Sequence, residues 1–197
     1  MAGFAHDLYL ARHGQTEWNA VQRMQGRLNS ALTPKGRQEA ARLRAILDPL
    51  DLSGLDLRVS PQGRAVQTAA IALGHREAPL RTDDRLMEID VGAWSGLYMH
   101  EMRAQRPDLF SDDPAQRLAW YDAAPGGEGF DGLKARCESL MADLKGPAVL
   151  IAHGITIRML RSLALAGDTS RFGDAPGIAQ GVVYHCKDGV LSVLAPD

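Results

Sequence analysis

Two histidines, each followed by a glycine, come directly after short apolar segments. The segment 8–11 is followed by Arg12 and His13, and the segment 149–152 is followed by His153. Short apolar segments of this kind predict buried strands. In an open α/β sheet, ligands bind outside the carboxyl ends of the strands. We therefore expect both histidines to lie at one edge of a sheet and to share a site.

The first of these histidines and its neighbours have the chemistry needed to attack a phosphate ester. A neutral imidazole is a nucleophile when a hydrogen bond holds one ring nitrogen and the other nitrogen faces the substrate. The backbone carbonyl of Gly14 is a natural partner for His13, because glycine lets the backbone approach closely. Arg12 offers a planar fork of donors that matches phosphate oxygens. A tripeptide is a weak motif, and a buried histidine with a purely structural role remains the alternative.

Three more residues complete a candidate phosphate site. Arg64 lies in the first turn of a predicted helix, where free N–H groups and the helix dipole attract anions. Glu88 lies in a loop and could protonate the leaving oxygen as a general acid, with Asp90 as the rival acid. A protonated His153 could stabilise the equatorial oxygens of a transferring phosphoryl group. Each residue alone is at least as consistent with a structural or solvated role, so only their combination predicts a site.

Strands and helices alternate along the chain, as is needed to bring these side chains together. Strands are predicted at residues 8–11, 55–59, 80–82, 148–152, 181–186 and 190–194, the last two as a hairpin. Helices are predicted from Thr33-Pro34 to about residue 48, from Ser60-Pro61 to residue 73, and over residues 133–144 and 154–164. This alternation predicts an α/β fold, a three-layer α/β/α sandwich with a mixed, mainly parallel sheet.

The length of 197 residues predicts a single domain that spans residues 1–197. Within it, residues 97–128 give only a weak pattern, with short helices broken near Pro107 and Pro114. We call residues 97–128 the cap segment. We expect it to be a small insertion that covers part of the sheet edge and closes over the substrate.

The composition carries no nucleic-acid or membrane signature. The formal net charge is -2, and no run approaches the ~18 apolar residues that a membrane span needs. The two cysteines indicate no disulfide framework, and no spacing of histidines or cysteines indicates a metal site. No signal peptide is expected at the N-terminus. We therefore expect a cytoplasmic protein, with a homodimer as the commonest default among soluble oligomers.

Five short motifs occur in one order between residues 7 and 165. They are Arg-His-Gly-x-Thr-x-x-Asn from Arg12, Ser-Pro-x-x-Arg-Ala-x-Gln-Thr-Ala from Ser60, Glu-x-Asp-x-Gly-x-Trp-x-Gly from Glu88, Pro-Gly-Gly-Glu from Pro125, and His-Gly-x-x-x-Arg from His153. In this order the chain resembles the histidine phosphatase superfamily, also called the phosphoglycerate mutase-like family. The resemblance implies phosphoryl transfer through a phosphohistidine.

The same resemblance implies roles for individual residues. His13 matches the histidine that becomes a phosphohistidine, and Glu88 matches the acid that protonates the leaving group and then activates water. The phosphate-binding positions match Arg12, Thr16, Asn19, Gln25, Gly26, Arg64, His153 and Gly154. Arg12, Arg64 and His153 count as catalytic as well. Family members need no metal and no cofactor, because several hydrogen-bonding groups position the phosphate and stabilise its charge.

The pattern favours the phosphatases of this family over its mutases. Val91 stands where mutases carry a tyrosine, the cap segment has no Arg-Arg pair, and Ile155 stands where mutases carry an asparagine. Asn29 and Ile155 also depart from the common phosphatase pattern, which we expect to affect specificity or packing. We predict a metal-independent phosphatase that acts on phosphomonoesters of small metabolites. The alternatives are a cofactor-dependent phosphoglycerate mutase and, more remotely, an inactive phospho-ligand-binding domain.

Overall fold

The structure, a computed structural model, describes residues 3–77, 79–110, 113, 116–174 and 177–196. The strands are β1 (Leu8–Arg12), β2 (Asp56–Val59), β3 (Leu80–Thr82), β4 (Ala148–Ala152), β5 (Val183–Lys187) and β6 (Val190–Leu194). The α-helices are α1 (Glu17–Ala20), α2 (Pro34–Leu47), α3 (Gly63–Leu73), α4 (Met99–Gln105), α5 (Ala119–Asp122), α6 (Gly129–Asp143) and α7 (Gly154–Ala166). Short 3₁₀ helices are η1 (Asp84–Leu86), η2 (Gly92–Trp94) and η3 (Pro107–Leu109). No helix within these ranges is long and apolar enough to span a membrane.

The strands form one sheet in the order β3-β2-β4-β1-β5-β6. The pairs β3–β2, β2–β4 and β4–β1 are parallel, whereas β1–β5 and β5–β6 are antiparallel. The predicted mixed, mainly parallel sheet is thus confirmed. Arg12, the last residue of β1, is in register with Ala152, the last residue of β4. These neighbouring strands therefore end at the same level, and His13 and His153 follow them side by side.

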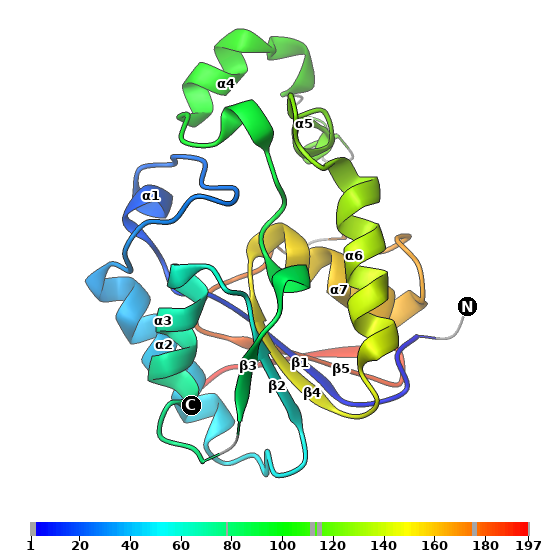
Figure 1. The fold of residues 1–197 in the computed structure, drawn as a ribbon. Helices are drawn as coiled ribbons and strands as arrows, with labels where there is room; N and C mark the ends of the chain where they lie inside the picture. Colours follow the sequence, from blue (N-terminus) through cyan, green and yellow to red (C-terminus); the bar gives the residue numbers. More distant parts are fainter. Residues whose placement is uncertain (1–2, 78, 111–112, 114–115, 175–176, 197) are drawn as a thin grey trace.

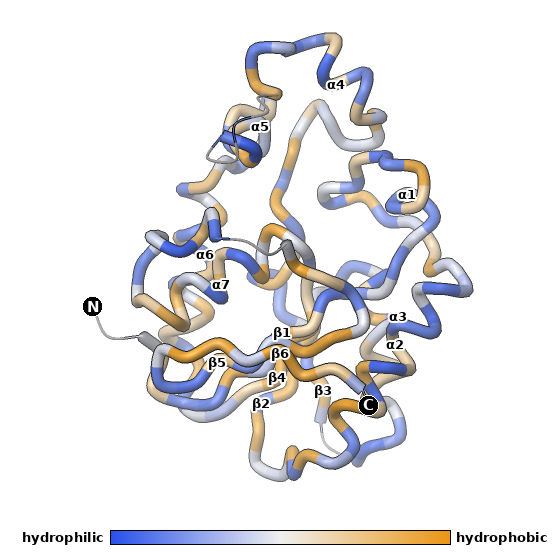
Figure 2. Tube along the Cα trace, turned by 180° about the vertical axis from the view of Figure 1, so that it is seen from behind, coloured by the Kyte–Doolittle hydropathy of each residue, from blue (hydrophilic) through white to orange (hydrophobic). Residues whose placement is uncertain are grey.

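Helices cover both faces of the sheet (Figure 1). Helices α2 and α3 lie on one face and α6 and α7 on the other, which confirms the three-layer α/β/α sandwich. Alternate residues of β4 supply the two cores: Val149 and Ile151 pack with the α2–α3 layer, and Leu150 packs with the α6–α7 layer. A strand buried on both faces needs apolar residues throughout, which is why β4 is a continuous apolar run. Figure 2 shows the hydrophobic strands from behind, between helices of mixed hydropathy.

One helix starts as predicted and another does not. Thr33 caps α2, and its side chain accepts a hydrogen bond from the N–H of Gly36. The predicted start of the next helix at Ser60 is wrong, because α3 begins after Gln62, its N-cap residue. The hydroxyl of Ser60 lies 2.7 Å from a ring nitrogen of His153. The hydroxyl expected to cap the helix therefore binds His153, 93 positions away in the sequence, and accepts from the N–H of Gln62 at 3.3 Å, ahead of the first turn of α3.

Two further helix boundaries differ from the expectations. The loop after β1 contains the short helix α1, which the apolar pattern does not predict. Thr16 caps this helix, and Asn19 completes a capping box with it. Helix α6 begins at Gly129, about one turn before the predicted start at Leu133. Leu133 is the first fully buried side chain of α6, so the apolar stripe begins later than the helix itself.

The cap segment contains α4, η3 and α5 and lies beyond the carboxyl ends of the strands, at the top of Figure 1. The predicted break near Pro107 is confirmed, because α4 ends before it and η3 begins at it. The break predicted near Pro114 lies outside the described residues.

Aromatic rings fasten the cap segment to the loop that precedes it. The ring of Trp94 in η2 lies 6.1 Å from that of Phe110 and 6.3 Å from that of Trp120, centroid to centroid. Phe110 and Trp120 stack on each other at 5.6 Å. Because Trp94 follows Glu88 by only six positions, this cluster fixes the cap relative to the loop that carries the candidate acid.

Candidate active site

His13 leaves β1 with one ring nitrogen held by a hydrogen bond. Its Nδ1 lies 2.7 Å from the carbonyl oxygen of Gly14. A carbonyl oxygen only accepts, so Nδ1 carries the proton and Nε2 keeps a lone pair. Burial, together with the charges of Arg12 and Arg64, lowers the pKa of His13 well below 6.5. The ring is therefore neutral at neutral pH, the form in which a histidine can attack phosphorus.

Gly14 permits this arrangement because the chain passes very close to α2 at this point. A Cβ on Gly14 would collide with the backbone of Gly36, and a Cβ on Gly36 would collide with the backbone of Gln15. The N–H of Gly14 donates to the hydroxyl of Thr68 in α3 at 3.0 Å. Helices α2 and α3 thus hold His13 through its neighbouring residue.

Arg64 is buried in the first turn of α3 and donates hydrogen bonds in three directions. Nη1 donates to the carbonyl of Leu28 at 2.5 Å, Nη2 to that of Gly26 at 2.9 Å, and Nε to Nδ1 of His153 at 3.2 Å. The backbone N–H of Arg64 donates to Oδ1 of Asn29 at 2.8 Å, so Asn29 holds the start of α3. Burial lowers the pKa of Arg64 to about 10, which leaves the guanidinium charged at neutral pH.

The ring of His153 is neutral, in contrast to the protonated form considered from the sequence. Its Nδ1 accepts from Arg64, so Nε2 carries the ring proton and donates to the hydroxyl of Ser60 at 2.7 Å. The side chain is fully buried, with its ring centroid 5.1 Å from that of His13. Burial and the charge of Arg64 lower the pKa of His153 well below 6.5. A buried ring beside a cation is neutral because both surroundings disfavour a second positive charge.

A small cavity of about 80 Å³ lies against the predicted phosphate-binding residues. Its lining consists of Arg12, His13, Asn19, Arg23, Met24, Gln25, Gly26, Arg64, Glu88 and Tyr121. A water molecule in the liquid takes up about 30 Å³, so the cavity has room for a small anion. The buried Nε of Arg12 has no hydrogen-bond partner among the described residues. Arg12, which is half-buried, and Arg64, which is buried, both line this cavity, and their positive charge makes it attractive to phosphate.

Three predicted phosphate-binding residues do not line this small cavity. Thr16 is fully buried, and its hydroxyl accepts from the N–H of Asn19 at 3.2 Å and from Nε2 of Gln25 at 2.9 Å. Gly154 lines a larger neighbouring cavity. His153 does not line the small cavity, but it accepts a hydrogen bond from Arg64, which does. Thr16 therefore positions the loop that carries Asn19 and Gln25.

The carboxylate of Glu88 faces the start of α7. Oε1 accepts from the N–H groups of Ile89 at 2.9 Å and Thr156 at 3.1 Å, and Oε2 accepts from the N–H of Ile155 at 3.2 Å. Free N–H groups at a helix start suit a carboxylate. Glu88 also lines both cavities. Oε2, with one donor among the described residues, is the oxygen that has room to exchange a proton with a bound ester.

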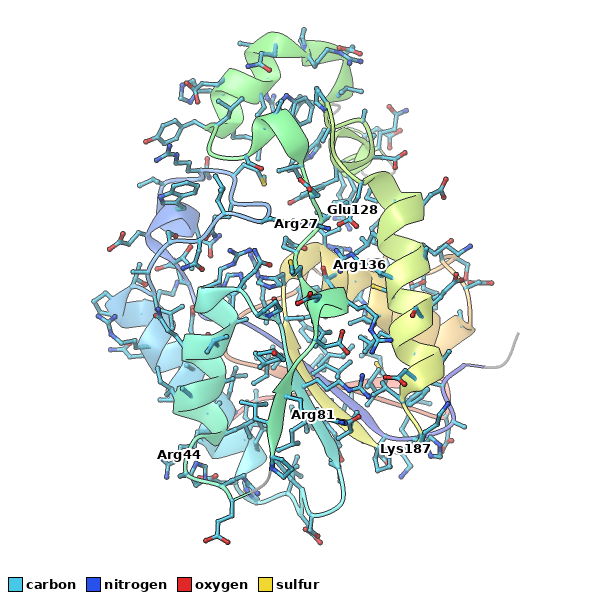
Figure 3. The ribbon with its side chains drawn as sticks, viewed as in Figure 1. Arg27, Arg44, Arg81, Glu128, Arg136 and Lys187 are labelled. Atoms are coloured by element: carbon cyan, nitrogen blue, oxygen red, sulfur yellow. The ribbon has the colours of Figure 1, made fainter. Side chains whose placement is uncertain are left out.

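Asp90, the rival acid, belongs to an ion-pair network and lines neither cavity. Its Oδ2 lies 3.6 Å from Nε of Arg27. Arg27 also lies 3.6 Å from Glu128, and Arg136 of α6 binds Glu128 at 2.8 Å. Figure 3 shows Arg27, Glu128 and Arg136 close together, between the loop after β1 and the start of α6. Of the two acids in this loop, Glu88 is therefore the one beside the cavities.

Two polar residues support the site without having been predicted. Nε2 of Gln62 donates to the carbonyl of Gly26 at 3.0 Å, and its Oε1 accepts from the N–H of Glu88 at 2.7 Å. Gln62 thereby links the loop after β1, which carries Gly26, to Glu88. In the same way, Ser60 links the end of β2 to His153. The sequence carries no signal for these contacts, since polar residues near a helix start are usually caps or solvated side chains.

Within the described ranges, no group of three or more His, Cys, Asp and Glu side chains could hold a metal ion. The polar groups around the small cavity are mainly cationic or neutral donors, with Glu88 as the carboxylate, and this set suits an anionic ester.

The family of the chain follows from comparison with known proteins. A model of the Histidine phosphatase superfamily (branch 1) matches residues 8–186. The chain belongs to this superfamily. The resemblance predicted from the five motifs is thereby confirmed.

Curated relatives of this histidine phosphatase superfamily member carry more than one name. A glucosyl-3-phosphoglycerate phosphatase of Mycobacterium tuberculosis is 35% identical over 182 residues, which cover 82% of this chain and 76% of the relative. A probable phosphoglycerate mutase, GpmB, of Enterobacter is 32% identical over 167 residues, with coverage of 80% and 74%. Among solved structures, Bacillus stearothermophilus YhfR is 32% identical with a TM-score of 0.78, covering 97% of this chain and 96% of that one. The α/β fold of the chain is therefore that of the superfamily.

Proposed function

We propose that this protein hydrolyses phosphomonoesters of small metabolites through a phosphohistidine at His13. The observation behind this proposal is a neutral imidazole with its Nδ1 held by Gly14, beside a small cavity that Arg12 and Arg64 line. Phosphoryl transfer needs a positioned nucleophile and positive charge around the phosphate oxygens. A phosphatase of a small phosphorylated metabolite stands among the relatives at 35% identity, which supports this activity.

In the first step, the lone pair on Nε2 of His13 attacks phosphorus. The N–P bond forms while the P–O bond to the leaving group breaks. Arg12 and Arg64 bind the non-bridging oxygens, whose negative charge would otherwise oppose the attack. Glu88, in its protonated form, gives its proton to the leaving oxygen, so that an alcohol departs.

In the second step, a water molecule attacks the phosphorus of phospho-His13. Glu88, now a carboxylate, takes a proton from this water. The N–P bond breaks, its electron pair returns to Nε2, and inorganic phosphate leaves. The hydrogen bonds from the N–H groups of Ile155 and Thr156 keep the carboxylate in one position for both proton transfers.

His153 is assigned a positioning role in this mechanism. Its two ring nitrogens are engaged by Ser60 and Arg64, so it orients the guanidinium that binds phosphate. Asn19, Gln25 and Gly26 complete the phosphate-binding set, since all three line the small cavity.

We propose that the whole chain forms one functional domain. Residues 1–197 act as a single domain, and the cap segment closes over the part of the substrate beyond its phosphate. The cytoplasm is the compartment we propose, because Cys137 and Cys186 are free thiols, which suit a reducing compartment. The homodimer expected from the prevalence of two-fold oligomers stays a prediction, which sedimentation equilibrium tests.

The deciding experiment is to trap the phosphoenzyme. Wild-type protein given a radiolabelled phosphomonoester and quenched in alkali should carry an acid-labile label. His13→Ala should lose the label and release phosphate from p-nitrophenyl phosphate at least about 10³-fold more slowly. His75→Ala, a matched change at a surface histidine that pairs with Asp48, should keep both signals.

Other outcomes separate the alternatives. Near-normal turnover by His13→Ala would overturn the assignment of the nucleophile. Binding of phosphate by the wild type without any release of phosphate from esters would favour the inactive phospho-ligand-binding domain.

A further inference from the structure

A second, larger cavity adjoins the small one. It has a volume of about 520 Å³ and shares Arg12, Glu88 and Tyr121 with the small cavity. Small-molecule sites typically measure about 300–1,000 Å³, so a metabolite-sized group fits here. Because Glu88 protonates the leaving oxygen in the proposed mechanism, the leaving group has to lie on this side of the phosphate.

The wall of the larger cavity combines apolar surface with one further guanidinium. Trp120 and Tyr121 of the cap segment line it, their rings stacked 3.6 Å apart, together with Ile155 and Ile178. Arg158 of α7 also lines it. Away from Arg12 and Glu88, which it shares with the small cavity, the wall is thus mainly apolar with one strong polar group, as is typical of a site that orients a small ligand through that group.

Arg158 has hydrogen bonds on only part of its guanidinium. The residue is 6% exposed, and its Nη1 donates to the carbonyls of Phe172 at 3.4 Å and Asp174 at 2.9 Å. Among the described residues, Nε and Nη2 have no acceptor, and no carboxylate forms an ion pair with this arginine. Nη2 lies beside the cavity wall, 3.5 Å from where a Cβ on Gly177 would be. The edge formed by Nε and Nη2 is therefore available to a ligand.

The surroundings of Arg158 add positive charge. Arg161 donates to the same carbonyl of Asp174 at 3.0 Å, and Arg117 donates to the neighbouring carbonyl of Gly173 at 2.9 Å. Burial is the main cause that lowers the pKa of Arg158, and the charges of Arg117 and Arg161 lower it further. A buried cation without a paired anion costs free energy. An anion bound at Nε and Nη2 would offset that cost.

We propose that the larger cavity binds the leaving group of the substrate and that Arg158 binds a carboxylate on that leaving group. This assignment depends on the proposed function, because the leaving group enters the cavity only when the phosphate lies in the small one. The substrate class is therefore a phosphomonoester of a small hydroxy acid.

A carboxylate fits this position better than a second phosphate. One edge of a guanidinium binds the two oxygens of a carboxylate through parallel hydrogen bonds. The small cavity, in contrast, is lined by three arginines, Arg12, Arg23 and Arg64, as suits a phosphate dianion. Arg158 follows Gly154 by about one helical turn, roughly 6 Å along α7. The carboxylate is therefore expected only a few bonds away from the ester oxygen.

Two substrates that differ in this one group provide the test. 3-Phosphoglycerate carries a carboxylate where glycerol 3-phosphate carries a hydroxymethyl group. We expect the wild-type kcat/KM to be at least about tenfold higher for 3-phosphoglycerate. Arg158→Met should bring this ratio to about one. Arg158→Lys should keep part of it, because the charge remains while the fork is lost.

Arg161→Met is the matched control for this experiment. Arg161 lies on the same helix and donates to the same carbonyl of Asp174, but it does not line the cavity. Arg161→Met should keep the wild-type ratio of kcat/KM values. If Arg158 only supported the fold, Arg158→Met would lower both kcat/KM values and leave their ratio unchanged as well. The ratio of the wild type is informative even if Arg158→Met fails to fold.

The outcomes that contradict the carboxylate site differ from those that contradict the phosphatase. A wild-type ratio near one would overturn the carboxylate site and leave the phosphatase standing. Equal losses on both substrates in Arg158→Met would do the same. If the wild type released no phosphate from either substrate or from p-nitrophenyl phosphate, the proposed function would fall, and the carboxylate site with it.

Discussion

Nε of Arg64 donates to Nδ1 of His153 over 3.2 Å, and this hydrogen bond holds both side chains in place. It requires an unprotonated Nδ1, so the ring proton lies on Nε2, where the hydroxyl of Ser60 accepts it. Nη1 and Nη2 of Arg64 each use one proton on a backbone carbonyl and keep a second one. The neutral ring of His153 and two backbone carbonyls thus orient the charged guanidinium of Arg64. Its remaining N–H groups are available to bind a phosphate.

Removal of this guanidinium should abolish the protection that phosphate gives to the fold. Phosphate at 100 times its Kd stabilises a protein by about 2.7 kcal/mol, which raises the Tm of a chain of this size by roughly 5–10 °C. We expect this shift in the wild type and almost none in Arg64→Met, measured by thermal unfolding. Arg81→Met is the control, because Arg81 (labelled in Figure 3) pairs with Asp56 and lines neither cavity, so this variant should keep the full shift. A wild type that neither phosphate nor vanadate stabilises would contradict a shared phosphate pocket.

The two buried histidines should make the fold sensitive to mild acid. Burial and neighbouring charge hold the pKa values of His13 and His153 well below 6.5 in the folded state. Below pH 6.5 the unfolded chain therefore binds more protons than the folded one. The free energy of unfolding has its full value above pH 6.5 and decreases as the pH drops below it. Each ring contributes at most ~1.4 kcal/mol per pH unit. Urea unfolding at pH 7.5, 6.5 and 5.5 measures this slope.

A variant separates this effect from general acid denaturation. His13→Ala removes one of the two rings and should reduce the slope between pH 6.5 and 5.5 by about half. Bound phosphate should also flatten the slope, since a nearby dianion favours protonated imidazole. Constant stability from pH 7.5 to 5.5 would show that the rings are not held neutral.

Strong local patterns predict much of the fold, and distant partners account for the errors. Strand β4 forms where it is predicted, at residues 148–152, because a run of apolar residues has few alternatives to burial. The start predicted for α3 at Ser60 is wrong: the helix begins after Gln62, and the hydroxyl of Ser60 binds His153, 93 positions away. No local rule anticipates such a partner. Helix α1 has four residues, too few to show an apolar period.

The same limit applies to the candidate site. The motifs name residues that the structure gathers at one edge of the sheet, with Arg12, His13, Arg64 and Glu88 around one cavity. Protonation states do not follow from the motifs. The neutral ring of His153 depends on full burial and on a guanidinium 89 positions away, which only the folded arrangement reveals.

Replacement of Glu88 by Gln should slow esters with poor leaving groups far more than p-nitrophenyl phosphate. An alkoxide needs a proton as it departs, whereas p-nitrophenolate hardly does. General acid catalysis is worth about 10²–10⁴-fold, so the loss on an alkyl phosphate should fall in that range. Asp90→Asn is the matched control, since Asp90 pairs with Arg27 and lines neither cavity. Equal losses on both kinds of ester would indicate that Glu88 binds substrate without protonating the leaving group.

The arginines of the cap segment bear on the choice between hydrolysis and phosphoryl exchange. A mutase has to return the phosphoryl group to a bound acceptor before water arrives, which requires positive charge over the site. Arg106 pairs with Asp108, and the guanidinium of Arg103 lies over the ring of Phe110, 5.4 Å from its centroid. The third, Arg117, donates to the carbonyl of Gly173 at 2.9 Å, and none of the three arginines lines a cavity of the active site. The cap therefore offers little to hold the second phosphate of a bisphosphate.

Water should consequently reach phospho-His13 more readily than a second phosphate acceptor does. We expect net hydrolysis, with interconversion of 3- and 2-phosphoglycerate at least about tenfold slower than phosphate release, a difference of ~1.4 kcal/mol in barrier height. This should hold even when 2,3-bisphosphoglycerate is supplied. The measurement is a paired assay on one preparation that scores free phosphate and isomer exchange, with His13→Ala as the blank for both. Exchange that outpaces phosphate release would show that the protein is a mutase, because phospho-His13 would then survive long enough to be passed to a second substrate molecule.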